Sequence, residues 1–184
     1  MTSLQHVPTQ TIISVSDHVS LTTIDNTDLH DLVHHINDPV LYENTLTVPY
    51  PYNMGHAERY LAQVRAFEEK EGRQKDWVIR KDGRLIGGIG VLYNFGLNSH
   101  KSEIGYWISR EYRGMGIMTR SIGAFVSHLF DTTQLIRIEA NVFVGNYASA
   151  RVLEKNHFVL EGTVRTAFVK NGIPKDTWLY GLVK

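Results

Sequence analysis

Two glycines one residue apart, Gly114 and Gly116, stand directly before a run of residues that reads as a helix. Glycine costs about 1 kcal/mol relative to alanine inside a helix, so its use there needs a reason. Either the backbone adopts angles that only glycine tolerates, or a ligand approaches the main chain more closely than a side chain would allow. A strand, a glycine pair and a helix in that order are typical of an anion site, because first-turn amides and the helix dipole attract phosphate.

The spacing separates classes of phosphate-binding loop. A Walker loop ends in Gly-Lys-Ser/Thr, whereas Ile117 and Met118 follow Gly116 here. The dinucleotide fingerprint requires a small residue where Thr119 stands, although Glu139 could supply its distal acidic residue. That fingerprint also opens a long series of parallel strand–helix units, and this chain closes with a hairpin. Taken alone, the glycine pair fits a tight turn without a ligand equally well.

Composition limits the classes of protein that this chain can be. Its 184 residues favour one domain spanning 1–184, and 19 basic residues balance 19 acidic ones, so no nucleic-acid partner is indicated. The absence of cysteine excludes disulfides, a thiolate metal site and a cysteinyl-acyl intermediate. The longest apolar run, 85–95, is too short to span a membrane, and the first ten residues lack the pattern of a secretory signal. We therefore expect a cytoplasmic protein with no membrane partner and no metal.

Hydrophobic periodicity and turn residues give an order of elements. It predicts a strand or hairpin over 11–24, a helix over 29–36 that Asp38-Pro39 ends, and a second helix capped by Asn53. Strands at 76–80 and 85–93 form a hairpin, a strand at 102–109 leads to the glycine pair, and a helix follows. A strand at 137–144, a short helix at 147–156 and a hairpin around Asn171-Gly172 complete the chain. The mixture indicates an α+β fold.

Four motifs extend this interpretation to a family. They are Arg-Gly-x-Gly at 113–116, Asn146-x-x-Ser149, LEKNHF at 153–158 and VPYPY at 48–52. Over about residues 20–183 the chain resembles the GNAT superfamily of acyl-CoA-dependent N-acetyltransferases. Within it the chain is most similar to the RimJ/RimL-like branch, which modifies protein amino termini and small amines. The resemblance implies a mixed, mostly antiparallel sheet with a splayed strand pair, flanked by about four helices.

The resemblance also implies acetyl-CoA as co-substrate, with its pyrophosphate wrapped by the glycine loop and its pantetheine arm lying against the strand before it. The implied contacts are Tyr106, Trp107, Ile108, Arg113, Gly114, Met115, Gly116, Ile117, Met118, Asn141, Asn146 and Ser149. One position departs from the family pattern: Glu111 stands where a glutamine or arginine usually begins the glycine motif. Its carboxylate must point away from the phosphates, which leaves the amides and Arg113 to bind them.

Acetyl transfer to an amine needs a base, an oxyanion donor and a proton for the leaving thiolate. Direct attack is favoured, because no cysteine could carry an acyl group. By resemblance, Glu103 is the candidate base, and an exposed strand carboxylate is the alternative. The main-chain N–H near Ile108 is the candidate oxyanion donor.

The candidate proton donor to the thiolate is Ser149. Many relatives use a tyrosine, but Leu153 occupies that position here, and the closer branch suggests the serine. Its other interpretation is an ordinary first-turn residue of a helix that Asn146 caps. Phe168 stands where some relatives carry a glutamate, which argues against a water relay from that strand.

Other clusters of polar residues and glycines carry less weight. His30 and His34 lie one helical turn apart, yet no third ligand has matching spacing, so a solvated helix face is expected. The glycines at 87–90 lie within a strand, where a bulge or close packing is expected. Three tyrosines either line the acceptor site or pack in the core: Tyr42, Tyr50 and Tyr52.

The sequence thus predicts an acetyl-CoA-dependent N-acetyltransferase, with a protein N-terminal α-amine of ribosomal-protein type as the favoured acceptor. One alternative is a small free amine such as a polyamine, amino acid or drug. Another is a non-catalytic acyl-CoA-binding module. The oligomeric state stays open between a monomer and a homodimer.

Overall fold

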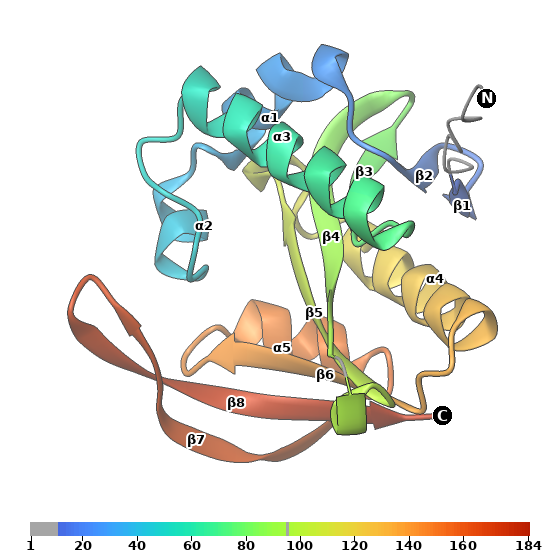
Figure 1. Ribbon diagram of the computed structural model, residues 1–184. Helices are drawn as coiled ribbons and strands as arrows, with labels where there is room; N and C mark the ends of the chain where they lie inside the picture. Colours follow the sequence, from blue (N-terminus) through green and yellow to red (C-terminus); the bar gives the residue numbers. More distant parts are fainter. Residues whose placement is uncertain (1–10, 95) are drawn as a thin grey trace.

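A single twisted sheet crosses the molecule (Figure 1). The computed structural model describes residues 11–94 and 96–184, so the first ten residues, where a secretory signal was sought, lie outside it. In the described part the sheet has eight strands in the order β1-β2-β3-β4-β5-β6-β8-β7. The strands are β1 (Ile13–Ser16), β2 (Val19–Thr22), β3 (Asp76–Lys81), β4 (Arg84–Tyr93), β5 (Lys101–Ile108), β6 (Arg137–Phe143), β7 (Val159–Lys170) and β8 (Ile173–Val183). The helices are α1 (Leu29–Ile36), α2 (Pro39–Glu43), α3 (Met54–Glu71), α4 (Ile117–Thr132) and α5 (Tyr147–Glu154).

The pair β5–β6 is parallel, and the other neighbouring strands in the sheet are antiparallel. These two strands share a register only between 101–103 and 137–139. Beyond that point β5 stays paired with β4, and β6 stays paired with β8. Figure 1 shows the two strands diverging. The predicted mixed sheet with a splayed strand pair is confirmed.

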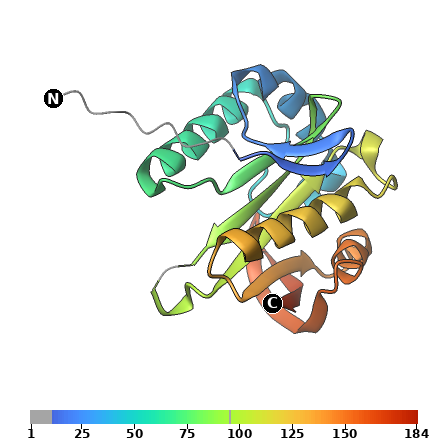
Figure 2. The ribbon, with the colours of Figure 1, turned by 90° about the vertical axis from the view of Figure 1, so that its right-hand side faces the viewer.

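Helices cover both faces of the sheet, as Figures 1 and 2 show. On one face α4 buries Ile117, Ile122, Phe125 and Leu129 in a large apolar core that also takes in α5. On the other face α1 and α3 form a smaller core with the strand residues Val78 and Leu85. Successive side chains of a strand point to opposite faces of the sheet, so neighbouring positions on one strand pack in different cores. In the described residues, no helix is long and apolar enough to cross a membrane.

Side-chain caps set the helix boundaries. Asn53 accepts from the N–H of His56 at 3.1 Å, which confirms the predicted cap of α3. Asn146 accepts from the N–H of Ser149 at 3.2 Å and caps α5, as predicted. Asp38 caps α2, a short helix that the sequence analysis did not predict. Pro39, interpreted there only as the end of α1, is also the first residue of α2, because proline suits the first turn of a helix.

A buried ion pair ties the segment before α1 to the sheet. The Arg80 guanidinium on β3 donates to the two carboxylate oxygens of Asp28 at 2.5 and 2.7 Å, and Asp28 is 3% exposed. The other end of the molecule has a similar polar link. Lys170, at the tip of the β7–β8 hairpin, is buried and donates to the carbonyl oxygens of Tyr42 and Thr45. Loops far apart in sequence are therefore fixed by charged side chains.

Candidate functional site

The glycine loop between β5 and α4 adopts left-handed backbone angles. Gly114 has φ +78° and Gly116 has φ +71°, a region that side-chain-bearing residues rarely adopt. A Cβ on Gly114 would meet no atom within 4 Å, so crowding in the protein does not explain that glycine. The backbone conformation alone therefore accounts for Gly114, whereas a Cβ on Gly116 would also lie 3.0 Å from the guanidinium of Arg120. Room for a ligand is a further consequence of their missing side chains.

The amino end of α4 offers main-chain amides. In the described part of the chain, no side chain caps this helix, whose N-cap residue is Gly116. The side chains of Ile117 and Met118 are buried in the core, whereas that of Met115 is 56% exposed. The first-turn N–H groups and the helix dipole are suited to an anion, and phosphate binding there stays a prediction.

Arg113 makes an internal ion pair. Its Nη2 lies 2.6 Å from Oδ2 of Asp38, the cap of α2, and 3.5 Å from the carbonyl oxygen of Ile108. A phosphate contact from this guanidinium stays a prediction. The guanidinium would have to share its donors with Asp38, which its five N–H groups permit.

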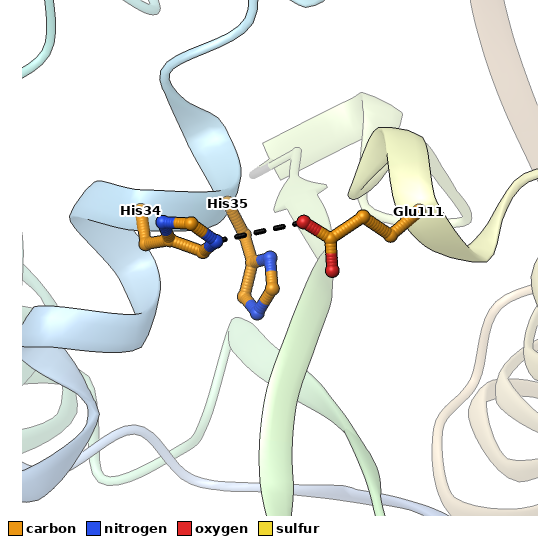
Figure 3. A group of neighbouring side chains, drawn as sticks. All are labelled: His34, His35 and Glu111. Carbon is orange, nitrogen blue, oxygen red and sulfur yellow. Dashed lines mark ion pairs between the residues drawn. The ribbon is translucent and has the colours of Figure 1, made fainter.

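Glu111 faces α1. Figure 3 shows its carboxylate directed toward His34, with Nε2 of His34 3.5 Å from Oε1. His35 lies beside them, and its Nδ1 is 2.9 Å from Oγ of buried Ser109. Burial lowers the pKa of His35. The ligand atoms of these three residues lie within 4.8 Å of one another, a grouping that the spacing of His30 and His34 did not predict. Those two histidines are both exposed, as expected for a solvated helix face.

Main-chain N–H groups of β5 point into the gap between β5 and β6. The N–H of Ser109 donates to the carbonyl of Ile86 at 2.9 Å, which fixes the alternation of hydrogen bonds between β4 and β5. In an antiparallel pair, residues alternate between facing the partner strand and facing away. The main-chain groups of Trp107 therefore face β4, and those of Tyr106 and Ile108 face the side where β6 has diverged. The Ile108 N–H therefore points into the gap, and its role as an oxyanion donor stays a prediction.

A cavity of about 670 Å³ includes this gap. It reaches from the start of α5 at Asn146 and Ser149, past both strands, to the loop 44–49 and α3. Glu103 and Asn141 line it from β5 and β6, and Phe168 lines it from β7. The cavity therefore joins part of the predicted cofactor positions to the predicted base, while Ile108 and the glycine loop 113–118 are not among the residues that line it.

Glu103 has the environment of a tuned carboxylate. Burial raises its pKa and the neighbouring charge of Glu139 acts in the same direction, while hydrogen bonds from Asn141 oppose both. The Asn141 side chain is itself held by Thr177, whose hydroxyl donates to Oδ1 at 3.1 Å. A raised pKa brings a carboxylate closer to the pH at which it can take a proton from an ammonium group. Asn141, predicted as a cofactor contact, lies against the candidate base.

Ser149 is hydrogen-bonded to a tyrosine. Its Oγ lies 2.7 Å from the hydroxyl of Tyr106, which crosses from β5 to α5. Burial raises the Tyr106 pKa, so the phenol stays protonated near neutral pH. Leu153, at the usual tyrosine position, is fully buried. The phenol–serine pair was missed from sequence because its members lie 43 residues apart and no local pattern links them.

The remaining candidate residues either line the cavity or pack against neighbouring groups. Tyr52 is buried and lines the cavity, whereas Tyr42 and Tyr50 stack with ring centroids 5.7 Å apart. The glycines at 87–90 are closely packed, as expected. A Cβ on Gly87 would lie 2.6 Å from the carbonyl oxygen of Trp107, and one on Gly88 would lie 2.6 Å from the indole nitrogen of the same residue.

Comparisons with known proteins give a consistent result. Residues 18–159 match the family model of the acetyltransferase (GNAT) domain. The chain is 35% identical over 136 residues to YoaA of Bacillus subtilis, an uncharacterized N-acetyltransferase, covering 72% of this chain and 76% of that protein. It is 37% identical over 103 residues to YdaF of Bacillus subtilis, a putative ribosomal N-acetyltransferase, covering 56% of each. The matched region therefore spans little more than half the length of that relative.

Solved structures agree in fold over nearly the whole length. The structure of RimL, a ribosomal L7/L12 alpha-N-protein acetyltransferase, in complex with coenzyme A superposes with a TM-score of 0.83 at 25% identity. The superposition covers 94% of this chain and 98% of that one.

Proposed function

This chain belongs to the acetyltransferase (GNAT) family, and from that premise we propose that it transfers the acetyl group of acetyl-CoA to a primary amine, by direct attack. The favoured acceptor is the α-amine of a protein amino terminus. The observation that carries the proposal is the cavity that joins the strand gap to Glu103. The uncapped amino end of α4 supplies a phosphate site after the same strand.

The residues divide the work of the reaction. The α4 amides bind the pyrophosphate, and the Ile108 N–H stabilises the oxyanion that forms as the amine nitrogen attacks the thioester carbon. Glu103, directly or through a water molecule, takes the proton that the amine loses. As the carbon–sulfur bond breaks, Ser149, backed by the Tyr106 hydroxyl, donates a hydrogen bond or a proton to the thiolate. A free thiol has a pKa near 8.5, so this last assistance is modest.

The choice of a protein acceptor rests on the relatives. YdaF is described as a putative ribosomal N-acetyltransferase, and RimL as an α-N-protein acetyltransferase of ribosomal L7/L12. A half-buried carboxylate with a raised pKa that lines the cavity is suited to act as a base, which favours an enzyme over a non-catalytic module.

The test is a panel of acceptors assayed with acetyl-CoA, in which released coenzyme A is measured as free thiol. Peptides with free amino termini are compared with the same peptides acetylated at the amino terminus and with polyamines and amino acids. We expect turnover that depends on a free α-amine. Turnover restricted to small amines would mean that the acceptor is a small amine and not a protein amino terminus. Cofactor binding without any amine-dependent thiol release would overturn the enzymatic proposal.

A further inference from the structure

A row of three residues crosses the sheet beside the strand gap. Asp76 on β3 lies opposite Gly90 on β4, and Gly90 lies opposite Gly105 on β5. All three line the cavity. The row shares its sheet face with Glu103 and Trp107, because residues two apart on a strand point the same way. Two of the three positions in the row carry no side chain.

Gly105 is the open position of the row, whereas Gly90 is covered by its neighbours. Gly105 does not have a left-handed backbone, and a Cβ there would meet no atom within 4 Å. The place of a Cβ on Gly90 lies 2.6 Å from Oδ1 of Asp76. The aspartate therefore extends over Gly90, and its carboxylate lies about one strand spacing, roughly 4.8 Å, from Gly105. Trp107, whose indole lies across Gly88, forms the wall on one side.

The carboxylate of Asp76 is held in place and keeps room for further bonds. Tyr60 of α3 is hydrogen-bonded to it, and Nζ of Lys75 lies 3.7 Å from Oδ2. Burial raises the pKa of Asp76, and these two neighbours act against that rise. Once ionised, the carboxylate has about four acceptor positions, which exceeds the two neighbours. Arg59 and His56 of α3 also line the cavity, whose acidic lining residues are Asp76 and Glu103.

Building on the proposed function, we propose that the acceptor lies across Gly105, beside the Asp76 carboxylate that covers Gly90, with its amine toward Glu103. Asp76 then accepts a hydrogen bond from a donor group of the acceptor, and so helps to select it. One strand spacing of roughly 4.8 Å plus a hydrogen bond of about 2.9 Å places that donor within about 8 Å of Gly105. A hydroxyl on the first residue of a peptide and a second ammonium group on a small amine are the two sources of such a donor.

The first experiment measures a preference. The ratio of kcat/KM is determined for a serine-initiated against an alanine-initiated peptide, and for 1,4-diaminobutane against butylamine. Asp76→Asn should reduce the preferred ratio about tenfold, because it removes a charge-assisted hydrogen bond. The affinity for acetyl-CoA should not change. Asp17→Asn, in the exposed turn between β1 and β2, is the matched control and should keep the wild-type ratio.

The second experiment fills the open position at Gly105. Gly105→Val should raise the acceptor KM about tenfold or more while acetyl-CoA affinity and melting temperature stay close to wild type. Gly162→Val on β7 is the control, since a Cβ there also meets no atom within 4 Å and the backbone is not left-handed.

The outcomes separate this inference from the function on which it rests. If the wild-type protein acetylates an amine but Asp76→Asn keeps the wild-type ratio in both acceptor pairs, the selection role of Asp76 is wrong. If Gly105→Val leaves the acceptor KM unchanged, the position of the acceptor is wrong. A wild-type protein that acetylates no amine would instead refute the proposed function.

Discussion

Replacing Glu103 with glutamine tests the mechanism most directly. The change keeps the shape of the side chain and its ability to accept the hydrogen bonds of Asn141, but removes the base. Positioned acid–base groups contribute about 10²- to 10⁴-fold. We expect the low end, a loss of about 10²-fold in kcat/KM or roughly 2.7 kcal/mol, because Glu103 is half-buried and the cavity has room for water that can accept the proton.

The pH profile identifies the group. In the wild type, kcat/KM should rise as Glu103 loses its proton, at a pH above the ordinary range of a glutamate because burial raises its pKa. Glu103→Gln should abolish this acidic limb. Glu139→Gln should keep the limb and move it to lower pH, since the charge of Glu139 helps to raise the Glu103 pKa. Glu139 is therefore a matched control at the paired position of the neighbouring strand.

Thermal stability gives an independent check, because Glu103→Gln is expected to raise the melting temperature while it lowers activity. A carboxyl whose pKa is raised on folding binds protons more tightly in the folded state, so it destabilises the fold above the folded pKa. Glu103→Gln should consequently melt at a higher temperature than wild type at neutral pH while losing activity. Initial rates of thiol release and thermal melts on the same samples decide the matter. A loss below about threefold across the profile, with the acidic limb intact, would refute the role of Glu103.

Three further changes address the cofactor, the leaving group and the scaffold. Gly116→Val should remove most acetyl-CoA affinity in calorimetry. Gly72→Val, at another left-handed position (φ +64°), should lose stability but keep affinity. Equal affinity in both variants would exclude the glycine loop as the binding site. Ser149→Ala should lower the rate about ten- to thirtyfold, or about 1 to 2 kcal/mol, in single-turnover assays, and a wild-type rate would return Ser149 to a helix-turn role. Asp28→Asn should cost about 3 kcal/mol in chemical denaturation, because it leaves Arg80 without its buried partner, and should spare acetyl-CoA binding.

Local patterns predicted the elements well. The capping residues Asn53 and Asn146, the helix after Gly116 and the closing hairpin follow from residues within a few positions of one another. The sequence did not predict the helix α2, because Pro39 was interpreted only as the end of the helix before it. A proline preceded by an aspartate is also a good helix start.

Contacts within the site were beyond sequence reasoning because they depend on strand register. The row formed by Asp76, Gly90 and Gly105 exists only once three strands are aligned, and a shift of one residue would send these positions to the other face. The ion pair between Arg113 and Asp38 likewise joins residues 75 positions apart. The resemblance to a family supplied the candidate residues, and the structure supplied their partners.

The short register between β5 and β6 also predicts a hinge between two parts of the sheet. Three residue pairs join one half-sheet, β1 to β5, to the other, β6 to β8 and β7. The large core under α4 binds the halves together on one face, but the core of α1 and α3 on the other face takes in no residue of β6, β7 or β8. Lys170 of β7 already links the halves through Tyr42 and Thr45, and a ligand that enters the gap would add a further bridge. Loading of acetyl-CoA should therefore stiffen the hinge and shape the acceptor cavity before the amine arrives, which predicts an ordered kinetic sequence with acetyl-CoA binding first.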